Sequence, residues 1–301
     1  MLSAATPENF VGECARLASA LRRGTDASSQ FVYPQRDSLD AAIAELACLA
    51  ELLHARGDDG LACRAQELCL EARLVEARGT ADFRELAARR FGVTAPEDEA
   101  AEAFAEPPPE DVSPTHLSDD KMDPDSLLSA VRGEVGRLFL PVRVITSARL
   151  ASLAAAAGTT IVVAEGRRTT AREARRTALH EIHGHVLPAL ARQRLGDVAA
   201  VRGAGDVDRE EGRALVIEEA AGFLDAGRRA DLGVRHLAAR WAHEGAELVD
   251  VVRGLLAYEL SMERAVLVAA RACRAGGLGR ERVYLPAYFA ERRRLCDTVS
   301  A

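Results

Sequence analysis

The sequence contains almost no lysine, because Lys121 is the only one in 301 residues and arginine supplies nearly all of the positive charge. Acidic residues outnumber basic ones, 46 to 39, which gives a formal net charge of -7 at pH 7. A protein that collects phosphate groups needs a broad basic surface, and this composition does not provide one. The sequence therefore argues against a nucleic-acid partner.

Long apolar runs are also missing, since no stretch of about 18 apolar residues occurs, the length that a membrane-spanning helix needs. The first residues, MLSAATPENFVGECARL, contain no charged leader followed by an apolar stretch. The six cysteines form no Cys-x-x-Cys pair, and most lie in helix-like segments. We therefore expect neither export nor membrane insertion, and we interpret the cysteines as reduced thiols of a cytoplasmic protein.

Hydrophobic residues make up 48% of the chain, enough for a substantial core. Residues 1–93 repeat apolar residues at three- and four-residue spacing, which predicts a helical N-terminal region. Residues 94–126 are rich in proline and acidic residues and predict a surface loop or linker, which leaves 127–301 as a third region. Local patterns predict strands at Leu140–Ser147 and Thr159–Glu165, and a helix start at a capping box of Thr170 and Glu173. The predicted fold class is α+β, mainly α-helical, with a small β-sheet.

Three of the seven histidines fall within the six residues HEIHGH, in which His180 and His185 are five residues apart. On a regular helix these two side chains would point about 140° apart and could not bind one metal ion. One extra residue in the turn, a π-bulge, would bring them to the same face. Gly184 tolerates unusual backbone angles, and Pro188 lacks the N–H that would bond to the carbonyl of Gly184. A π-bulge is therefore feasible here.

A catalytic zinc site needs a third protein ligand and an open position for water. We predict Glu219 as that ligand, with Glu218 as the alternative, because both interrupt an apolar helical segment. A carboxylate in such a segment is costly unless it meets a metal or a cation. Glu181, which follows the first ligand His180, would then act as the general base on water, as in His-Glu zinc peptidases.

Two other interpretations of the histidine segment stay open. Histidines on one helix can form a partly exposed polar face without a metal, although the pair Glu218 and Glu219 downstream favours a metal site. His183 shares a helix face with His180 and is an alternative ligand to His185. We expect His183 to support the ligands without binding the metal itself.

The segment from His180 to His185 matches a His-Glu-x-x-x-His signature, and the chain resembles the tyrosine carboxypeptidase family, which includes microtubule-associated tyrosine carboxypeptidases. Bacterial relatives carry a Gln-Glu-Gly-Leu-Ala motif, which residues 218–222 resemble in altered form, with its metal-binding glutamate at Glu219. Three further segments resemble the family: SQFVYP, EARGTADFRELAARRFG and ARACRAGGLGRERVYL. The resemblance therefore covers nearly the whole chain.

The sequence departs from the family pattern at a few positions. Ala220 and Ala221 replace the glycine and leucine of the acidic motif, Ala275 interrupts an Arg-Gly-Gly, and Arg280 stands where the family has a lysine. None of these changes removes a predicted ligand or the general base. They bear on substrate specificity instead.

The resemblance implies a zincin-like metallopeptidase in residues 127–301, with Zn²⁺ as its cofactor. It implies removal of a C-terminal residue, tyrosine or a similar aromatic, from a peptide or protein. Tyr284 is a candidate donor to the oxyanion, and Arg271, Arg274 and Arg280 are candidates to bind the terminal carboxylate of the substrate. The same arginines also suit the negative end of a helix, and Tyr284 also suits a core position.

Two other functions fit the motif. The spacing does not distinguish a carboxypeptidase from an aminopeptidase. Some dipeptidyl peptidases also use a His-Glu-x-x-Gly-His helix with a downstream Glu-Glu pair, although their chains are far longer. A non-catalytic protein that binds peptides on a peptidase scaffold is the third possibility, favoured by the altered acidic motif.

Overall fold

The computed structural model describes residues 5–25, 27–35, 37–92, 98–107, 113–195 and 203–300. The chain divides into two compact units, each assembled from segments that are distant in the sequence. The first unit contains Met1–Pro107, Val201–Val207 and Arg229–Pro286, and the second contains Pro108–Ala200, Asp208–Arg228 and Ala287–Ala301. The units therefore interleave along the chain, whereas the sequence led us to expect three consecutive regions.

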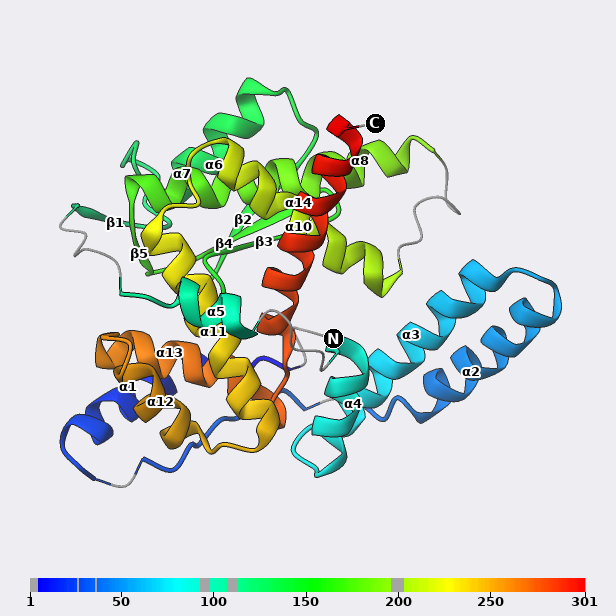
Figure 1. Cartoon of the computed structure of the whole chain (residues 1–301), viewed down its shortest axis with the longest axis horizontal. Helices are drawn as coiled ribbons and strands as arrows, with labels where there is room; N and C mark the ends of the chain where they lie inside the picture. The colour runs from blue at the N-terminus through cyan, green and yellow to red at the C-terminus, as the bar shows by residue number, and fades with distance from the viewer. Residues whose placement is uncertain are drawn as a thin grey trace. The chain divides into compact units, whose positions relative to one another are not determined.

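The first unit is helical, as the apolar spacing of its N-terminal part predicted. Its elements are α1 (Phe10–Arg22), α2 (Asp40–Ala55), α3 (Asp59–Glu76), α4 (Asp82–Phe91), α5 (Asp98–Phe104), most of α11 (Ala226–Glu244), α12 (Leu248–Leu256), α13 (Met262–Cys273), and the 3₁₀ turns η2 (Arg274–Gly276) and η3 (Arg280–Val283). Helices α2 and α3 run side by side as an antiparallel hairpin (Figure 1). No helix in the described part of the chain has both the length and the apolar character needed to cross a membrane.

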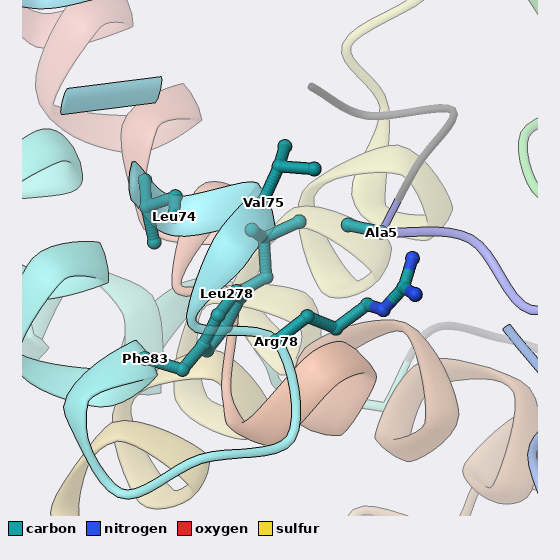
Figure 2. Close-up of a pocket in the computed structure, with 6 residues that line it drawn as sticks. All are labelled: Ala5, Leu74, Val75, Arg78, Phe83 and Leu278. Carbon is teal, nitrogen blue, oxygen red and sulfur yellow. The ribbon is translucent and has the colours of Figure 1, made fainter. Parts of the chain in front are cut away.

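A small apolar depression lies in the core of this unit, between α3, α4 and the segment after α13 (Figure 2). It is lined by Ala5, Leu74, Val75, Arg78, Phe83 and Leu278. The guanidinium of Arg78 donates a hydrogen bond to the carbonyl of Pro34 at 3.0 Å and lies over the ring of Tyr33. The depression leaves no room for a water molecule, and its lining is otherwise apolar. It reflects how the core packs and is not a reaction site.

The second unit contains all of the described strands together with helices around them. Its elements are β1 (Thr115–Leu117), α6 (Leu127–Arg137), β2 (Arg143–Ser147), β3 (Ala154–Ala157), β4 (Thr160–Ala164), β5 (Arg168–Thr170), α7 (Ala171–Leu179), the π-helix η1 (His180–Val186), α8 (Leu187–Gln193), and most of α10 (Ala204–Ala220) and α14 (Tyr284–Ser300). One sheet has the strand order β2-β4-β3, and β1 pairs with β5 in a second sheet. The predicted α+β class, mainly helical with a small sheet, is confirmed.

Both predicted strands are present, as β2 and β4, which pair in parallel. Strand β3 was not predicted, because its sequence is four alanines and alanine has a low preference for strands. It pairs antiparallel with β4, so the fully buried Ile161 and Val163 of β4 hold it in the sheet.

The histidine segment is packed against this sheet. Ile182 and Val186 of η1 are fully buried in one cluster with Ile161 and Val163 of the sheet and Val131 of α6. Apolar side chains on η1 therefore fix the direction in which its histidines point, since the opposite face of the turn is anchored in the core.

The local structure around the histidines follows the sequence signals. Thr170 and Glu173 form the predicted capping box at the start of α7, with each side chain accepting a hydrogen bond from the backbone N–H of the other residue. Helix α7 then continues into a π-helix from His180 to Val186, the kind of turn that would bring two histidines five positions apart to the same face. Pro188 stands in the first turn of α8, where its missing N–H is best tolerated.

Gly184 has a different role from the one that we expected. Its φ is not positive, so no unusual backbone angle requires glycine here. A Cβ at this position would lie 2.4 Å from the Cβ of Ala214 in α10. Gly184 is therefore needed because η1 and α10 approach each other closely, which also requires a small residue at position 214.

Residues 94–126 contain more regular structure than a loop or linker. Helix α5 and strand β1 both lie within this region. Residues 94–97 and 108–112, which hold half of the prolines of this region, lie outside the described residues.

We expect Gly184→Ala to lower the free energy of unfolding by about 1–3 kcal/mol, because the added methyl group overpacks the contact with Ala214. Urea unfolding followed by circular dichroism would measure this. Gly133→Ala is the matched control, because Gly133 lies in α6 with open space around it and alanine there should be neutral or slightly stabilising. Equal stability of Gly184→Ala and wild type would contradict the role of this contact.

Candidate functional site

The π-helix brings His180 and His185 together on one face of the chain. Their Nε2 atoms are 3.3 Å apart, and the ring centroids are separated by 5.2 Å. His180 is 9% exposed and His185 is half-buried, so both rings are largely shielded from water. The two imidazoles thus point their Nε2 atoms at a common place.

Glu211 of α10 is the third member of this group. Its Oε2 atom lies 3.3 Å from Nε2 of His180 and 3.5 Å from Nε2 of His185. One ligand atom of each residue falls within 4.8 Å of the others. Two imidazole nitrogens and one carboxylate oxygen form the donor set of many catalytic zinc sites. The residues present therefore fit a zinc ion bound by three protein ligands.

The other ring nitrogen of each histidine faces a further buried glutamate. Nδ1 of His180 is 2.6 Å from Oε1 of Glu218, and Nδ1 of His185 is 3.6 Å from Oε2 of Glu210. Glu218 is fully buried and Glu210 is 4% exposed in its side chain. Glu218, the alternative ligand in the sequence analysis, thus contacts the nitrogen of His180 that points away from Glu211.

These carboxylates give the site a negative potential. Burial acts to lower the pKa of His185, but Glu210 and Glu211 outweigh burial and raise this pKa to about 10. Burial also acts to lower the pKa of His180, but Glu211 and Glu218 outweigh it and raise this pKa. An arrangement that favours positive charge on both rings also favours a divalent cation between them.

Glu181 lies in the first turn of the π-helix and is 8% exposed. Its charge acts on both histidines, because it contributes to the raised pKa of His180 and of His185. Among the described residues, its carboxylate has no hydrogen bond or ion pair. Glu181 is therefore a nearly buried carboxylate that lies beside the histidines and remains available to a substrate or water.

The predicted ligand Glu219 is not part of the histidine group. Its Oε2 atom is 3.3 Å from Nε of Arg292 in α14, and its carboxylate is hydrogen-bonded to Tyr288. Burial and this hydrogen bond raise the pKa of Tyr288 to about 12. Of the residues that the structure describes, the group around the histidines that could hold a metal ion contains Glu211 and not Glu219.

A signal for Glu211 is present in the sequence. The motif Gln-Glu-Gly-Leu-Ala, which we had aligned with residues 218–222, also matches residues 210–214 at Glu211, Gly212 and Ala214. The structure gives a reason for each match. A Cβ on Gly212 would lie 2.2 Å from the carbonyl oxygen of Ala287 in α14, and Ala214 packs against Gly184. The motif thus describes a helix that supplies one carboxylate and two close contacts.

His183 points away from the metal-binding group. Its Nε2 atom is 2.7 Å from Oε1 of Glu134 in α6, and the same carboxylate pairs with Arg137. The third histidine of the segment therefore ties the π-helix to α6.

The predicted substrate-binding residues lie in the first unit, whereas the histidines lie in the second. Arg271 donates to Oε1 of Glu281 at 2.7 Å, and Arg235 donates to Oε2 of the same carboxylate at 2.7 Å. The guanidinium of Arg235 also lies over the ring of Tyr284, 4.8 Å from its centroid. Tyr284 and Arg271 therefore belong to one charged cluster around Glu281.

Arg274 and Arg280 complete this cluster. Arg274 is buried and donates to the carbonyl of Arg271 and to the hydroxyl of Thr6, at 3.0 Å and 3.3 Å. Burial and the neighbouring charge of Arg271 lower the pKa of Arg274 to about 10, and Arg280 acts in the same direction. Within the described part of the chain, Arg274 has no carboxylate at ion-pair distance.

A second group with metal-binding atoms consists of His116, Asp123 and Asp125. Nδ1 of His116 lies 2.7 Å from Oδ2 of Asp123, whose other oxygen accepts the backbone N–H of Asp125. These contacts stabilise the turn after β1, and Asp125 is exposed to solvent. The group is less buried than the histidine site, because His116 and Asp123 are only half-buried.

Comparison with known proteins agrees with the geometry. A family model described as microtubule-associated tyrosine carboxypeptidase matches residues 33–291. No curated protein and no solved structure matches the chain. The match to the family model covers most of the chain and includes the histidines, Glu181 and Glu211. The chain therefore belongs to the microtubule-associated tyrosine carboxypeptidase family.

Proposed function

We propose that this protein is a zinc-dependent carboxypeptidase that removes a C-terminal tyrosine, or a similar aromatic residue, from a peptide or protein. The family supports a carboxypeptidase. The convergence of His180, His185 and Glu211 is the observation that carries the metal-dependent chemistry. Glu181 lies beside them, and within the described ranges its carboxylate has no hydrogen bond or ion pair. Zinc would be held by the two imidazoles and by Glu211.

Zinc in such a site lowers the pKa of water towards neutrality and polarises a peptide carbonyl. Glu181 would accept a proton from the attacking water while the water oxygen forms a bond to the carbonyl carbon. Glu181 would then pass the proton to the leaving nitrogen as the C–N bond breaks. This role suits Glu181 because its carboxylate is shielded from solvent and is not engaged by a neighbouring cation.

Two further roles are proposed from the family resemblance. An arginine would bind the terminal carboxylate of the substrate, and Arg274 is favoured over Arg271, since Glu281 already neutralises Arg271. Arg280 remains the third candidate. Tyr284 would donate a hydrogen bond to the oxyanion that forms from the carbonyl.

We also propose a cytoplasmic location. All six cysteines are free thiols, and three of them, Cys48, Cys63 and Cys296, are exposed. Exposed thiols persist in reducing compartments and tend to be oxidised elsewhere. Labelling of the native protein, after isolation under non-oxidising conditions, should find these three thiols reactive.

Glu181→Gln should lower peptidase activity by about 10²- to 10⁴-fold, because glutamine cannot accept the proton of water. The measurement is mass spectrometry of a mixed peptide library, with zinc content determined in parallel. Bound zinc should remain close to the wild-type level, since Glu181 is not one of the three ligands. Full activity of this variant with zinc bound would exclude Glu181 as the general base.

Glu211→Ala should lose most of the bound zinc, whereas Glu219→Ala should keep it. Elemental analysis of both purified variants tests this prediction, and the two changes are matched because each removes one carboxylate from α10. Loss of zinc from Glu219→Ala alone would instead make Glu219 the third ligand.

Peptides that end in a free carboxylate should be cleaved, and the same peptides with an amidated C-terminus should not. A carboxypeptidase recognises the terminal charge, and a buried arginine left without that charge would remain unpaired. Equal cleavage of both sets would favour an aminopeptidase or dipeptidyl peptidase, and the position of the cleaved bond would distinguish them. Binding of peptides without cleavage would favour a regulator.

A further inference from the structure

We propose that Glu218 and Glu210 are positioning residues that orient the two histidine ligands, each through Nδ1, and that Arg228 and Arg192 hold these carboxylates in place. The inference rests on the metal site proposed above. It assigns a function to four buried or half-buried charged residues that take no part in the chemistry. It also predicts that the ring of His180 is held more firmly than the ring of His185.

The contact between His180 and Glu218 is short and enclosed. Nδ1 of His180 donates to Oε1 of Glu218 at 2.6 Å, which keeps a proton on Nδ1 and leaves Nε2 as the nitrogen that can bind a metal ion. Nε2 is the atom that faces Glu211. The hydrogen bond therefore selects the tautomer that a metal ligand needs and fixes the rotation of the ring.

Arg228 holds the carboxylate of Glu218 through both of its oxygens. Its Nε and NH2 groups donate to the two carboxylate oxygens at 2.8 Å and 3.0 Å, a bidentate arrangement. Arg176 of α7 adds a more distant charge, 4.0 Å from Oε2. A fully buried carboxylate would be costly without such partners. The two arginines thus allow a negative charge to remain beside His180.

Arg228 is itself placed by the segment that joins α10 to α11. Its backbone N–H donates a hydrogen bond to Oδ1 of Asp225. The other oxygen of Asp225, Oδ2, accepts a hydrogen bond from Nε of Arg172 at 2.8 Å. Arg172 also donates to the carbonyl of Gly222 at 2.5 Å. These bonds connect the start of α7, which leads to His180, with the start of α11, which supplies Arg228. The orientation of His180 is therefore supported both through α7, which leads to it, and through Arg228 at the start of α11.

His185 has the same sequence of partners, a glutamate at Nδ1 and an arginine on that glutamate, but its contact with the glutamate is longer. Oε2 of Glu210 is 3.6 Å from Nδ1 of His185, beyond a good hydrogen bond, and Oε1 pairs with NH1 of Arg192 at 2.5 Å. The side chain of Arg192 is 22% exposed, compared with 7% for Arg228. Removal of Glu210 should therefore weaken metal binding less than removal of Glu218.

The experiment measures zinc affinity of metal-stripped protein by competition with a chromophoric chelator of known affinity. We expect Glu218→Gln to weaken zinc binding about 10- to 100-fold and Glu210→Gln to weaken it by a smaller factor. Glu134→Gln is the matched control, because it removes the carboxylate that contacts His183, which is not a ligand. Its zinc affinity should equal that of wild type.

A purely structural role is distinguished by two additional measurements. Glu218→Gln leaves Arg228 without its charge partner, so the double variant Glu218→Gln/Arg228→Gln removes both buried charges at once. Melting of the metal-free proteins reports stability without zinc, so a loss of zinc affinity that exceeds any loss of stability distinguishes a positioning role from a structural one. We expect weaker zinc binding in the double variant.

Wild-type zinc affinity in Glu218→Gln or in the double variant would overturn the inference and leave the proposed function intact. A loss in Glu134→Gln equal to that in Glu218→Gln would also overturn it, because any histidine contact would then matter equally. If wild-type protein binds no zinc, the proposed function fails together with the inference. Glu210→Gln tests the second histidine separately, since Arg192 can turn towards solvent.

Discussion

The site depends on one irregular turn of helix. His185 lies five positions after His180, and only the π-helical turn places both rings on the same side. That turn is held by its apolar residues in the core of the second unit and by the close approach of Gly184 to Ala214. Because α10 lies so near, it can present Glu211 at 3.3 Å and 3.5 Å from the two Nε2 atoms.

The second physical requirement is to bury several carboxylates together. Glu210, Glu211 and Glu218 all lie on α10 with little exposure, and like charges so close would repel one another strongly. The chain compensates with the two histidines and with arginines that contact the outer carboxylates, Arg192 at Glu210 and Arg228 at Glu218. Glu211 lies within 3.5 Å of both imidazoles, which suits it to share a metal ion with them.

Much of this architecture could be predicted from local patterns. The capping box, the π-turn and the two β-branched strands depend on residues close together in the sequence, and all are found in the structure. The alanine strand β3 could not be predicted, because its conformation comes from pairing with β4. The division into interleaved units likewise depends on contacts between distant segments, which apolar spacing does not encode.

The choice of a third ligand shows how a sound principle can leave more than one candidate. A carboxylate in an apolar helical segment does need a compensating charge, but α10 contains two Glu-Glu pairs, and either metal or arginine can compensate. Helix geometry shows which of these glutamates face the histidines only when one contact between α10 and η1 is known. Ala214 faces Gly184, and Glu211 and Glu218 lie within about 60° of Ala214 on the helix, whereas Glu219 is rotated by about 140°. The contact between Ala214 and Gly184 therefore determines which glutamates of α10 can reach the histidines.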